Sequence, residues 1–213
     1  MKLYLFIIIF SVSILSYKSA EAFVQFRDPI QVYGQCDDKD INITLSPDAN
    51  AVSFLFNNSL LLESISQNLR KKNFNKRCIF RIPLKASPQI QFEIMNLDWR
   101  GFIAIPKYSE AHFRSQVWLT PTTSKNHEAC QSRVEIFKEK NLNFIGPKTK
   151  ELTIRQNLFE PRKVTECGKD YFLTIEVNLN LKNKKPTENA QFILDSLDLG
   201  QTLSNSIVER PCR

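Results

Sequence analysis

The stretch Leu173–Leu181 reads LTIEVNLNL and decides the fold class of this chain. Leucine, isoleucine and valine occupy every odd position, and threonine, glutamate and asparagine occupy every even one. Successive side chains of a β-strand point to opposite faces, so this alternation predicts a strand with one buried and one wet face. Shorter stretches with the same alternation are 41–45, 52–56, 80–84 and 90–94.

Turn-forming segments separate these predicted strands. They are Ser46-Pro47-Asp48, Ala86-Ser87-Pro88, Gly146-Pro147 and Lys184-Lys185-Pro186. Many short strands with regular breaks are typical of an antiparallel sandwich or barrel. We therefore expect an all-β fold, a single antiparallel β-sandwich-like domain. The segment 60–69 is the exception, because its apolar residues also suit one or two helical turns.

Composition places the chain among globular proteins. Of its 213 residues, 42% are hydrophobic and 24% are charged, which is enough to build a packed core. Five glycines and ten prolines are too few for a collagenous or low-complexity chain. The formal net charge of +7 is a moderate basic excess that by itself identifies no partner. Only two histidines are available for catalysis or metal binding.

The first 22 residues have the features of a secretory signal peptide. Lys2 precedes an apolar run over 3–15, and Ala20-Glu21-Ala22 offers small residues at the positions that signal peptidase reads. A transmembrane helix needs roughly 20 apolar residues, so an uncleaved anchor is the less favoured alternative. We expect removal of 1–22, with 23–213 forming the secreted β-rich domain. Export then ends in the extracellular space or a periplasm, with no integral membrane segment left.

Export makes disulfides the expected state of the cysteines, because no thiol buffer keeps them reduced outside the cytosol. The chain has five cysteines, all after the signal peptide, so two bridges and one remaining thiol is the simplest count. Metal binding is the alternative, but no Cys-x-x-Cys or His-x-x-x-His spacing occurs. The spacing of the cysteines does not tell which of them pair.

Several short motifs occur in a characteristic order along the predicted mature chain. They are Leu45-Ser46-Pro47-Asp48-Ala49, Lys76-Arg77-Cys78, Asp98-Trp99-Arg100-Gly101-Phe102, Gly146-Pro147, Cys167-Gly168, Asp195-Ser196-Leu197-Asp198 and Cys212. By this order the chain resembles the secreted family called domain of unknown function 4360 (DUF4360), from Val32 to Arg213. One departure is Trp99, where the family usually has tyrosine.

The resemblance also concerns the cysteines. The four family cysteines fall on Cys36, Cys78, Cys167 and Cys212. The resemblance implies disulfides between Cys36 and Cys78 and between Cys167 and Cys212, which leaves Cys130 as an additional thiol. It implies a secreted β-rich domain and brings no activity with it.

Residues for common catalytic chemistries are sparse. The Gly-x-Ser-x-Gly elbow of serine hydrolases does not occur. His112 and His127 suit surface or half-buried strand positions better than the position of a base. Cys130 follows His127 by three residues, but a catalytic cysteine also needs a depressed pKa and an oriented partner. We predict no catalytic residue, no metal site and no cofactor, and we expect a protein that is not an enzyme.

The acidic residues suggest two kinds of functional site, a calcium loop and a pair of catalytic aspartates. The segment 37–42 has oxygen-bearing side chains at the spacing of a calcium loop, but Ile43 stands where an EF-hand has glycine, which favours a solvated loop. Asp98, Asp195 and Asp198 would suit glycoside hydrolysis if folding brought two of them within roughly 5–10 Å. A secreted polysaccharide hydrolase with such an aspartate pair is therefore the alternative function, and turns fixed by these aspartates are the simpler interpretation.

The densest charge lies within twelve residues that contain six cations and no acidic residue: Arg70, Lys71, Lys72, Lys76, Arg77 and Arg81. Such a segment suits an anionic partner, an acidic polysaccharide or another cell-surface component. The alternative is a solvated loop that keeps an exported protein soluble. We do not expect nucleic acid to be the partner.

Aromatic residues suggest a second binding surface. Trp99, Trp118 and Tyr108 would form a platform for sugar rings if they met on one face, although core packing is the commoner fate of a tryptophan on a strand. We therefore expect a secreted, non-enzymatic β-domain that binds or decorates a cell surface or matrix. A purely structural role without a ligand is a further alternative.

Overall fold

The computed structural model describes residues 24–47, 51–57, 60–64, 73–94, 97–122, 133–156, 164–184, 187–199 and 207–212. The predicted signal peptide and Cys130 lie outside these ranges. None of the described residues forms a helix long and apolar enough to span a membrane.

The described residues form fifteen strands and one short 3-10 helix at Asp38–Asp40. The strands are β1 (Val24–Phe26), β2 (Gln31–Gly34), β3 (Ile41–Leu45), β4 (Val52–Phe56), β5 (Leu61–Ser64), β6 (Asn73–Ala86), β7 (Ile90–Ile94), β8 (Leu97–Ile105), β9 (Glu110–Pro121), β10 (Val134–Glu135), β11 (Lys140–Ile145), β12 (Lys148–Gln156), β13 (Tyr171–Lys182), β14 (Ala190–Leu199) and β15 (Ile207–Pro211).

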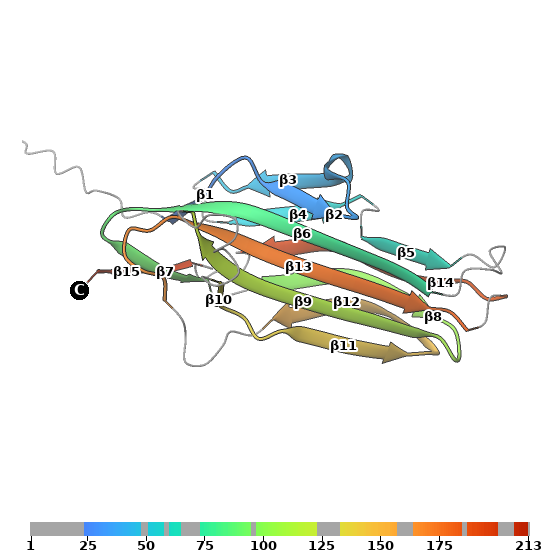
Figure 1. The fold of residues 1–213 in the computed structure, drawn as a ribbon. Helices are drawn as coiled ribbons and strands as arrows, with labels where there is room; N and C mark the ends of the chain where they lie inside the picture. The colour runs from blue at the N-terminus through green and yellow to red at the C-terminus, as the bar shows by residue number, and fades with distance from the viewer. Residues whose placement is uncertain are drawn as a thin grey trace, which may run out of the picture.

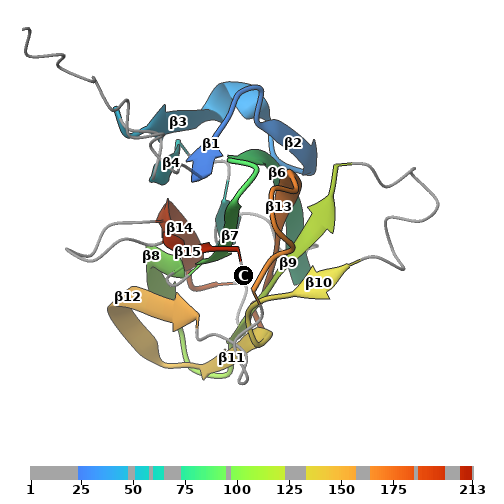
Figure 2. The ribbon, with the colours of Figure 1, turned by 90° about the vertical axis from the view of Figure 1, so that its left-hand side faces the viewer.

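These strands build two large antiparallel sheets and one small one (Figure 1). The seven-stranded sheet has the order β1-β6-β13-β9-β10, with β2 beside β6 and β11 beside β9. The six-stranded sheet has the order β12-β8-β14-β4-β3, with β5 beside β14. Figure 2, seen from one end, shows the two large sheets facing each other. The predicted antiparallel, all-β, sandwich-like fold is therefore confirmed.

Strand β13 contains the stretch that decided the fold class and lies in the middle of the seven-stranded sheet. It pairs along its whole length with β6 on one side and β9 on the other. Its apolar residues are completely buried: Leu173, Ile175, Val177, Leu179 and Leu181. The alternating polar residues consequently point to the outer face of this sheet.

The hydrophobic core lies between the two large sheets, where aromatic rings from both make contact. Phe54 of β4 lies 5.2 Å from Phe80 of β6, measured between ring centroids. Trp99 of β8 lies 5.7 Å from Phe113 of β9 in an edge-to-face arrangement. Each pair joins one sheet to the other, so these rings hold the sandwich together.

One local expectation needs correction. The segment for which helical turns were the alternative begins as strand β5, not as a helix. Leu62 pairs with Phe192 of β14, and Leu62 and Ser64 are buried while Glu63 is exposed. Pairing with a neighbouring strand therefore outweighs the local preference of these leucines for a helical conformation. Residues 65–69 of the segment lie outside the described ranges.

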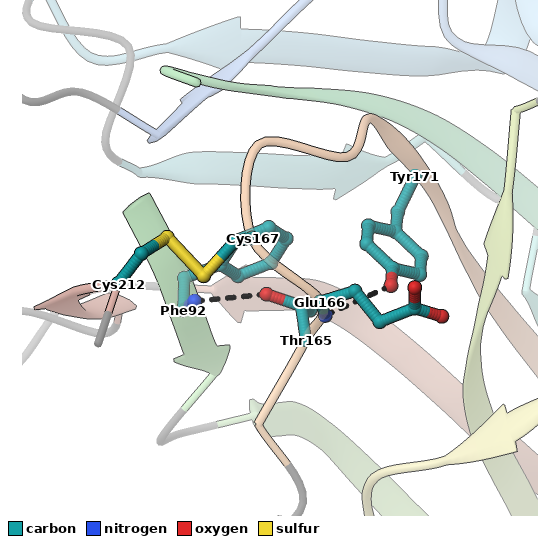
Figure 3. Close-up of a disulfide and its surroundings, with 6 residues drawn as sticks. All are labelled: Phe92, Thr165, Glu166, Cys167, Tyr171 and Cys212. Atoms are coloured by element: carbon teal, nitrogen blue, oxygen red, sulfur yellow. Dashed lines mark hydrogen bonds between the residues drawn. A yellow bond between two sulfur atoms is a disulfide. The ribbon is translucent and has the colours of Figure 1, made fainter. Parts of the chain in front are cut away.

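Two disulfides fasten segments that lie far apart in the sequence. Cys36 is bonded to Cys78, which joins the end of β2 to β6, and Cys167 is bonded to Cys212. These are the two pairs that the family resemblance implied. The second disulfide lies beside β7, where Thr165 Oγ1 accepts a hydrogen bond from the Phe92 N–H at 2.8 Å (Figure 3).

Candidate functional site

The outer face of the seven-stranded sheet carries a dense group of polar side chains. They come from β6, β13, β9 and β11, at the positions that alternate with the buried ones. The strand register arranges them in two adjacent cross-strand rows. We define the amide face as these two rows, Asn75-Asn180-His112-Asn143 and Arg77-Asn178-Arg114-Asn141.

Four amides of this face, including that of Asn75, have no side-chain partner among the residues that the structure describes. Asn143, Asn178 and Asn180 make no side-chain hydrogen bond to any residue that the structure describes. Asn178 and Asn180 are half-buried on the sheet, and Asn143 is exposed. Because each amide offers two N–H donors and one carbonyl acceptor, the face presents unused hydrogen-bonding groups of both kinds.

Arginine–carboxylate pairs hold the charged residues of the amide face. Arg77 Nε and Nη2 donate to the two carboxylate oxygens of Glu176, each at 2.9 Å. Arg114 donates in the same way to Glu139, at 2.9 and 3.0 Å. The hydrogen bonds from Arg114 hold the pKa of Glu139 below its ordinary value. Since such forked pairs fix both side chains, the face keeps its geometry without a ligand.

One end of the amide face is hollowed. The hollow has a volume of about 260 Å³, and its lining includes Glu110, His112, Asn143, Ile145, Asn180 and Lys182. Ile145 lies opposite Glu110 in the register of β9 and β11 and is 70% exposed. We call this site the β9–β11 hollow; it combines a polar lining with one exposed apolar side chain.

Two turns and a buried polar network fix the end of the molecule that carries this hollow. The Gly146 N–H donates to the Ser109 carbonyl at 2.9 Å, and a Cβ on Gly146 would lie 1.9 Å from the Pro106 carbonyl oxygen. Buried Ser109 Oγ donates to Asn183 Oδ1 at 2.9 Å, and Asn183 Nδ2 donates to Ser64 Oγ at 3.1 Å. Ser109 precedes β9 and Asn183 follows β13, so the network ties together the strands beneath the hollow.

The opposite end of the same face combines arginines with aromatic rings. The guanidinium carbon of Arg81 lies 3.8 Å from the ring centroid of Phe172, and that of Arg133 lies 3.8 Å from that of Trp118. Arg133 Nη2 also donates to Glu135 at 3.0 Å. Cation–π contacts of this kind hold the rings and the charges in place. The outer face therefore has an amide-rich end and an arginine–aromatic end.

A comparison with protein families now identifies the chain. The model for the domain of unknown function DUF4360 matches residues 29–212. The chain belongs to the DUF4360 family. No curated protein matches it.

Solved structures resemble the DUF4360 domain only distantly. TmCBM61, in complex with beta-1,4-galactotriose, is 12% identical with a TM-score of 0.25, and the match covers 80% of this chain and 88% of that chain. CBM28, a carbohydrate-binding module specific for non-crystalline cellulose, is 9% identical with a TM-score of 0.30, with 78% and 82% covered.

The predicted basic segment is divided between two faces of the DUF4360 domain. Arg77 and Arg81 lie on the outer face of β6, where Arg77 belongs to the amide face. Lys76 lies on the opposite side of the strand, where partial burial lowers the pKa of its ammonium group. Arg70, Lys71 and Lys72 lie outside the described ranges. Of the six predicted residues, Arg77 and Arg81 are thus the pair that the structure places on one surface.

The aspartates of the hydrolase hypothesis lie on the outer face of the six-stranded sheet. Asp98 of β8 is directly opposite Asp198 of β14, and Asp195 lies apart at the bulge of β14. Arg155 donates to both oxygens of Asp98, at 2.9 and 2.8 Å, and Arg100 lies 3.5 Å from Asp198. Folding brings two aspartates together, but each already contacts an arginine. The arrangement favours an ion-pair ladder on the sheet surface over a general acid.

The aromatic platform, the less favoured of the two alternatives, does not form. Trp99 is completely buried in the core, because its position on β8 faces the other sheet. Tyr108 lies in the turn before β9, and Trp118 lies at the arginine–aromatic end of the outer face. His127 is outside the described ranges, and within those ranges no cluster of three or more His, Cys, Asp or Glu could hold a metal ion.

The amide face itself was missed by the sequence analysis. Alternation within Leu173–Leu181 already places Asn178 and Asn180 on the wet face of their strand. The missing information was which strands flank β13, since Asn141 and Asn143 join the face through the register of β11 with β9. The visible signal was the pair of asparagines at alternate positions in both 141–143 and 178–180. A prediction that both segments pair with β9 would have placed these asparagines on one face.

Proposed function

We propose that this DUF4360 domain is an exported, non-enzymatic module that binds a polysaccharide of a cell surface or matrix through the amide face. The observation that carries the proposal is the group of amides without side-chain partners on a sheet fixed by paired arginines. Two disulfides agree with an oxidising compartment outside the cytosol.

Sugar hydroxyls match the chemistry of this face. A hydroxyl group donates one hydrogen bond and accepts others, and an asparagine amide also does both. The charged residues nearby are already neutralised in pairs, so they provide fixed donors and acceptors with little net charge of their own. A rigid face of this kind binds with a smaller entropic cost than one whose side chains must be ordered.

The basic residues give the proposal its second part, an attraction for acidic polysaccharides. Arg81 lies on the outer face against the ring of Phe172, whereas Arg77 is neutralised by Glu176, and Arg70–Lys72 precede β6 directly in the sequence. Charge–charge attraction of exposed groups weakens as salt screens it. Contacts made by the basic residues should therefore lose strength with salt, and contacts made by the amides should keep it.

Affinity electrophoresis of the purified mature protein tests the proposal. The gels would contain soluble neutral polymers (glucan, galactan and mannan) or acidic ones (polygalacturonate and alginate), at low and high salt. We expect retardation by at least one polymer, and about tenfold weaker binding in Asn178→Ala/Asn180→Ala, since each lost hydrogen bond costs about 0.5–1.5 kcal/mol.

Asn42→Ala is the matched control, since Asn42 is an exposed asparagine on the outer face of the six-stranded sheet. Charge reversal of Arg70, Lys71 and Lys72 to glutamate tests the basic segment and should abolish the salt-sensitive part of binding. Absence of binding to every polymer at both salt concentrations would contradict the proposed function.

A further inference from the structure

Resting on the proposed function, we infer that the β9–β11 hollow is a subsite for one neutral, hydroxyl-bearing sugar residue of the bound polysaccharide. The amide face defines the surface on which a chain lies, and this hollow defines a position along it. The inference concerns the class of sugar as well as the place, because the lining favours hydroxyl groups over an acidic group.

The size of the hollow suits a single sugar unit. Its volume is about 260 Å³, whereas pockets for drug-sized ligands measure roughly 300–1,000 Å³. Ile145, 70% exposed, provides an apolar contact for the C–H groups of a sugar ring. Asn143 and Asn180 provide amides without side-chain partners on the same lining. An apolar contact beside convergent polar groups is the usual composition of a small-molecule site.

The charges around the hollow do not select an anionic sugar. Glu110 lines it, and the hydrogen bond from Lys184 holds the pKa of that carboxyl below its ordinary value. Glu110 is therefore ionised at neutral pH, its charge and that of Lys184 offset each other in an ion pair, and its carboxylate oxygens accept hydrogen bonds from hydroxyls. Lys182 also lines the hollow, and its charge acts on Glu110 as well. Glu110 thus neutralises one of the two neighbouring lysines, so the lining offers no cluster of unpaired cations to an acidic sugar.

The hollow is held in shape by structure beneath it. Ile145 directly precedes Gly146, whose N–H is bonded to Ser109 and whose Cα has no room for a Cβ. Ser109 is bonded in turn to Asn183, one residue beyond Lys182. The side chains that would contact the sugar are therefore attached to a rigid frame, which reduces the entropy lost on binding.

The first test measures the affinity of variants for the neutral polymer that the wild-type protein binds. We expect Asn143→Ala/Asn180→Ala to bind about tenfold more weakly and Ile145→Ser to bind several-fold more weakly, with equal losses at low and high salt. Asn42→Ala should bind as the wild type does. Thermal unfolding of each variant shows whether it has kept its fold, and Asn143→Gln serves as the milder change if the double variant unfolds.

The second test is a proton NMR titration with simple sugars, because the chain has only two histidines. Comparison with His112→Gln assigns the imidazole signals of His112, which lines the hollow. We expect neutral methyl glycosides of glucose, galactose or mannose to shift these signals at millimolar concentration, and glucuronate to leave them in place.

The outcomes separate the inference from the proposed function. If the wild type binds a polymer but the hollow variants match Asn42→Ala, the subsite is wrong and the proposed function stands. If the hollow variants lose affinity only for acidic polymers, and only at low salt, the inferred sugar class is wrong. If the wild type binds no polymer, both fail together.

Discussion

Carboxylates next to the amide face hold its arginine side chains in place. Glu139 accepts hydrogen bonds from Arg114 and Gln116, two neighbouring outward residues of β9. The bonds from Arg114 lower the pKa of Glu139, and partial burial opposes this shift. A carboxyl whose pKa falls on folding stabilises the native state above its ordinary pKa, and this contribution is lost as the pH falls through the lowered value.

We therefore expect Glu139→Gln to lower the free energy of unfolding at neutral pH by about 0.5 kcal/mol, as is usual for an exposed ion pair. The difference from wild type should shrink between about pH 7 and about pH 2, because the wild-type carboxyl becomes protonated as the pH falls through its lowered pKa. Urea unfolding at both pH values measures it. Glu151→Gln is the control, an exposed glutamate on β12. A deficit of Glu139→Gln that is equal at both pH values would contradict this explanation.

At the scale of elements, β7 is held along both edges by segments from the last quarter of the chain. β15 pairs with it on one side. On the other side, the N–H groups of Thr165 and Gly168 donate to the carbonyls of Phe92 and Ile90, at 3.0 and 2.9 Å. The disulfide between Cys167 and Cys212 links these flanking segments (Figure 3). It thereby closes one end of the sandwich.

Removing this disulfide should lower the stability of the domain without changing its ligand binding. We expect Cys167→Ala/Cys212→Ala to lose about 2–4 kcal/mol in free energy of unfolding, because the unfolded chain regains freedom. The loss is measured by urea unfolding under non-reducing conditions. Cys130→Ala is the control and should be neutral, since the other four cysteines form the two disulfides. An equal loss in Cys130→Ala, or peptide mapping that links Cys130 to another cysteine, would contradict the assignment.

Elements were predictable from the sequence to different degrees. Strand β13 was evident because Leu173–Leu181 alternates without interruption between apolar residues, which are buried, and polar residues. Strand β5 was ambiguous, since three successive leucines carry no alternation and only the pairing with β14 decides their state. The residue type of Trp99 favoured a core position over a sugar platform, and its burial depends on which side of β8 faces the other sheet.

The candidate site was less predictable than the fold because it is assembled by register. Asn143 and Asn180 are 37 positions apart in the sequence. They lie on either side of His112, because both are opposite it in the strand register. Charge density, by contrast, is visible in the sequence, and it drew attention to Arg70–Arg81. Alternation along β6 then sends Lys76 and Arg77 to opposite faces, a separation that a charge count does not include.

At the scale of the whole molecule, the proposed export determines which residues the functional protein contains. Without Lys2, Lys18 and Glu21 the net charge of +7 becomes +6, so the mature domain remains basic. We expect the exported protein to begin at Phe23, because Ala20 and Ala22 satisfy signal peptidase. Intact-mass spectrometry of the protein from culture medium or periplasm measures this. An intact N-terminus retained in the membrane fraction would indicate an anchor.

The direction of β13 has a consequence for any tethered form of this domain. The strand begins near the disulfide to Cys212 and ends beside the β9–β11 hollow (Figure 1). Its twelve residues span about 36 Å at roughly 3.3 Å per residue. A sensor chip or bead coupled after Cys212 would therefore present the end that carries the β9–β11 hollow toward the solution, whereas coupling through the turn at Gly146 would bury that end against the support.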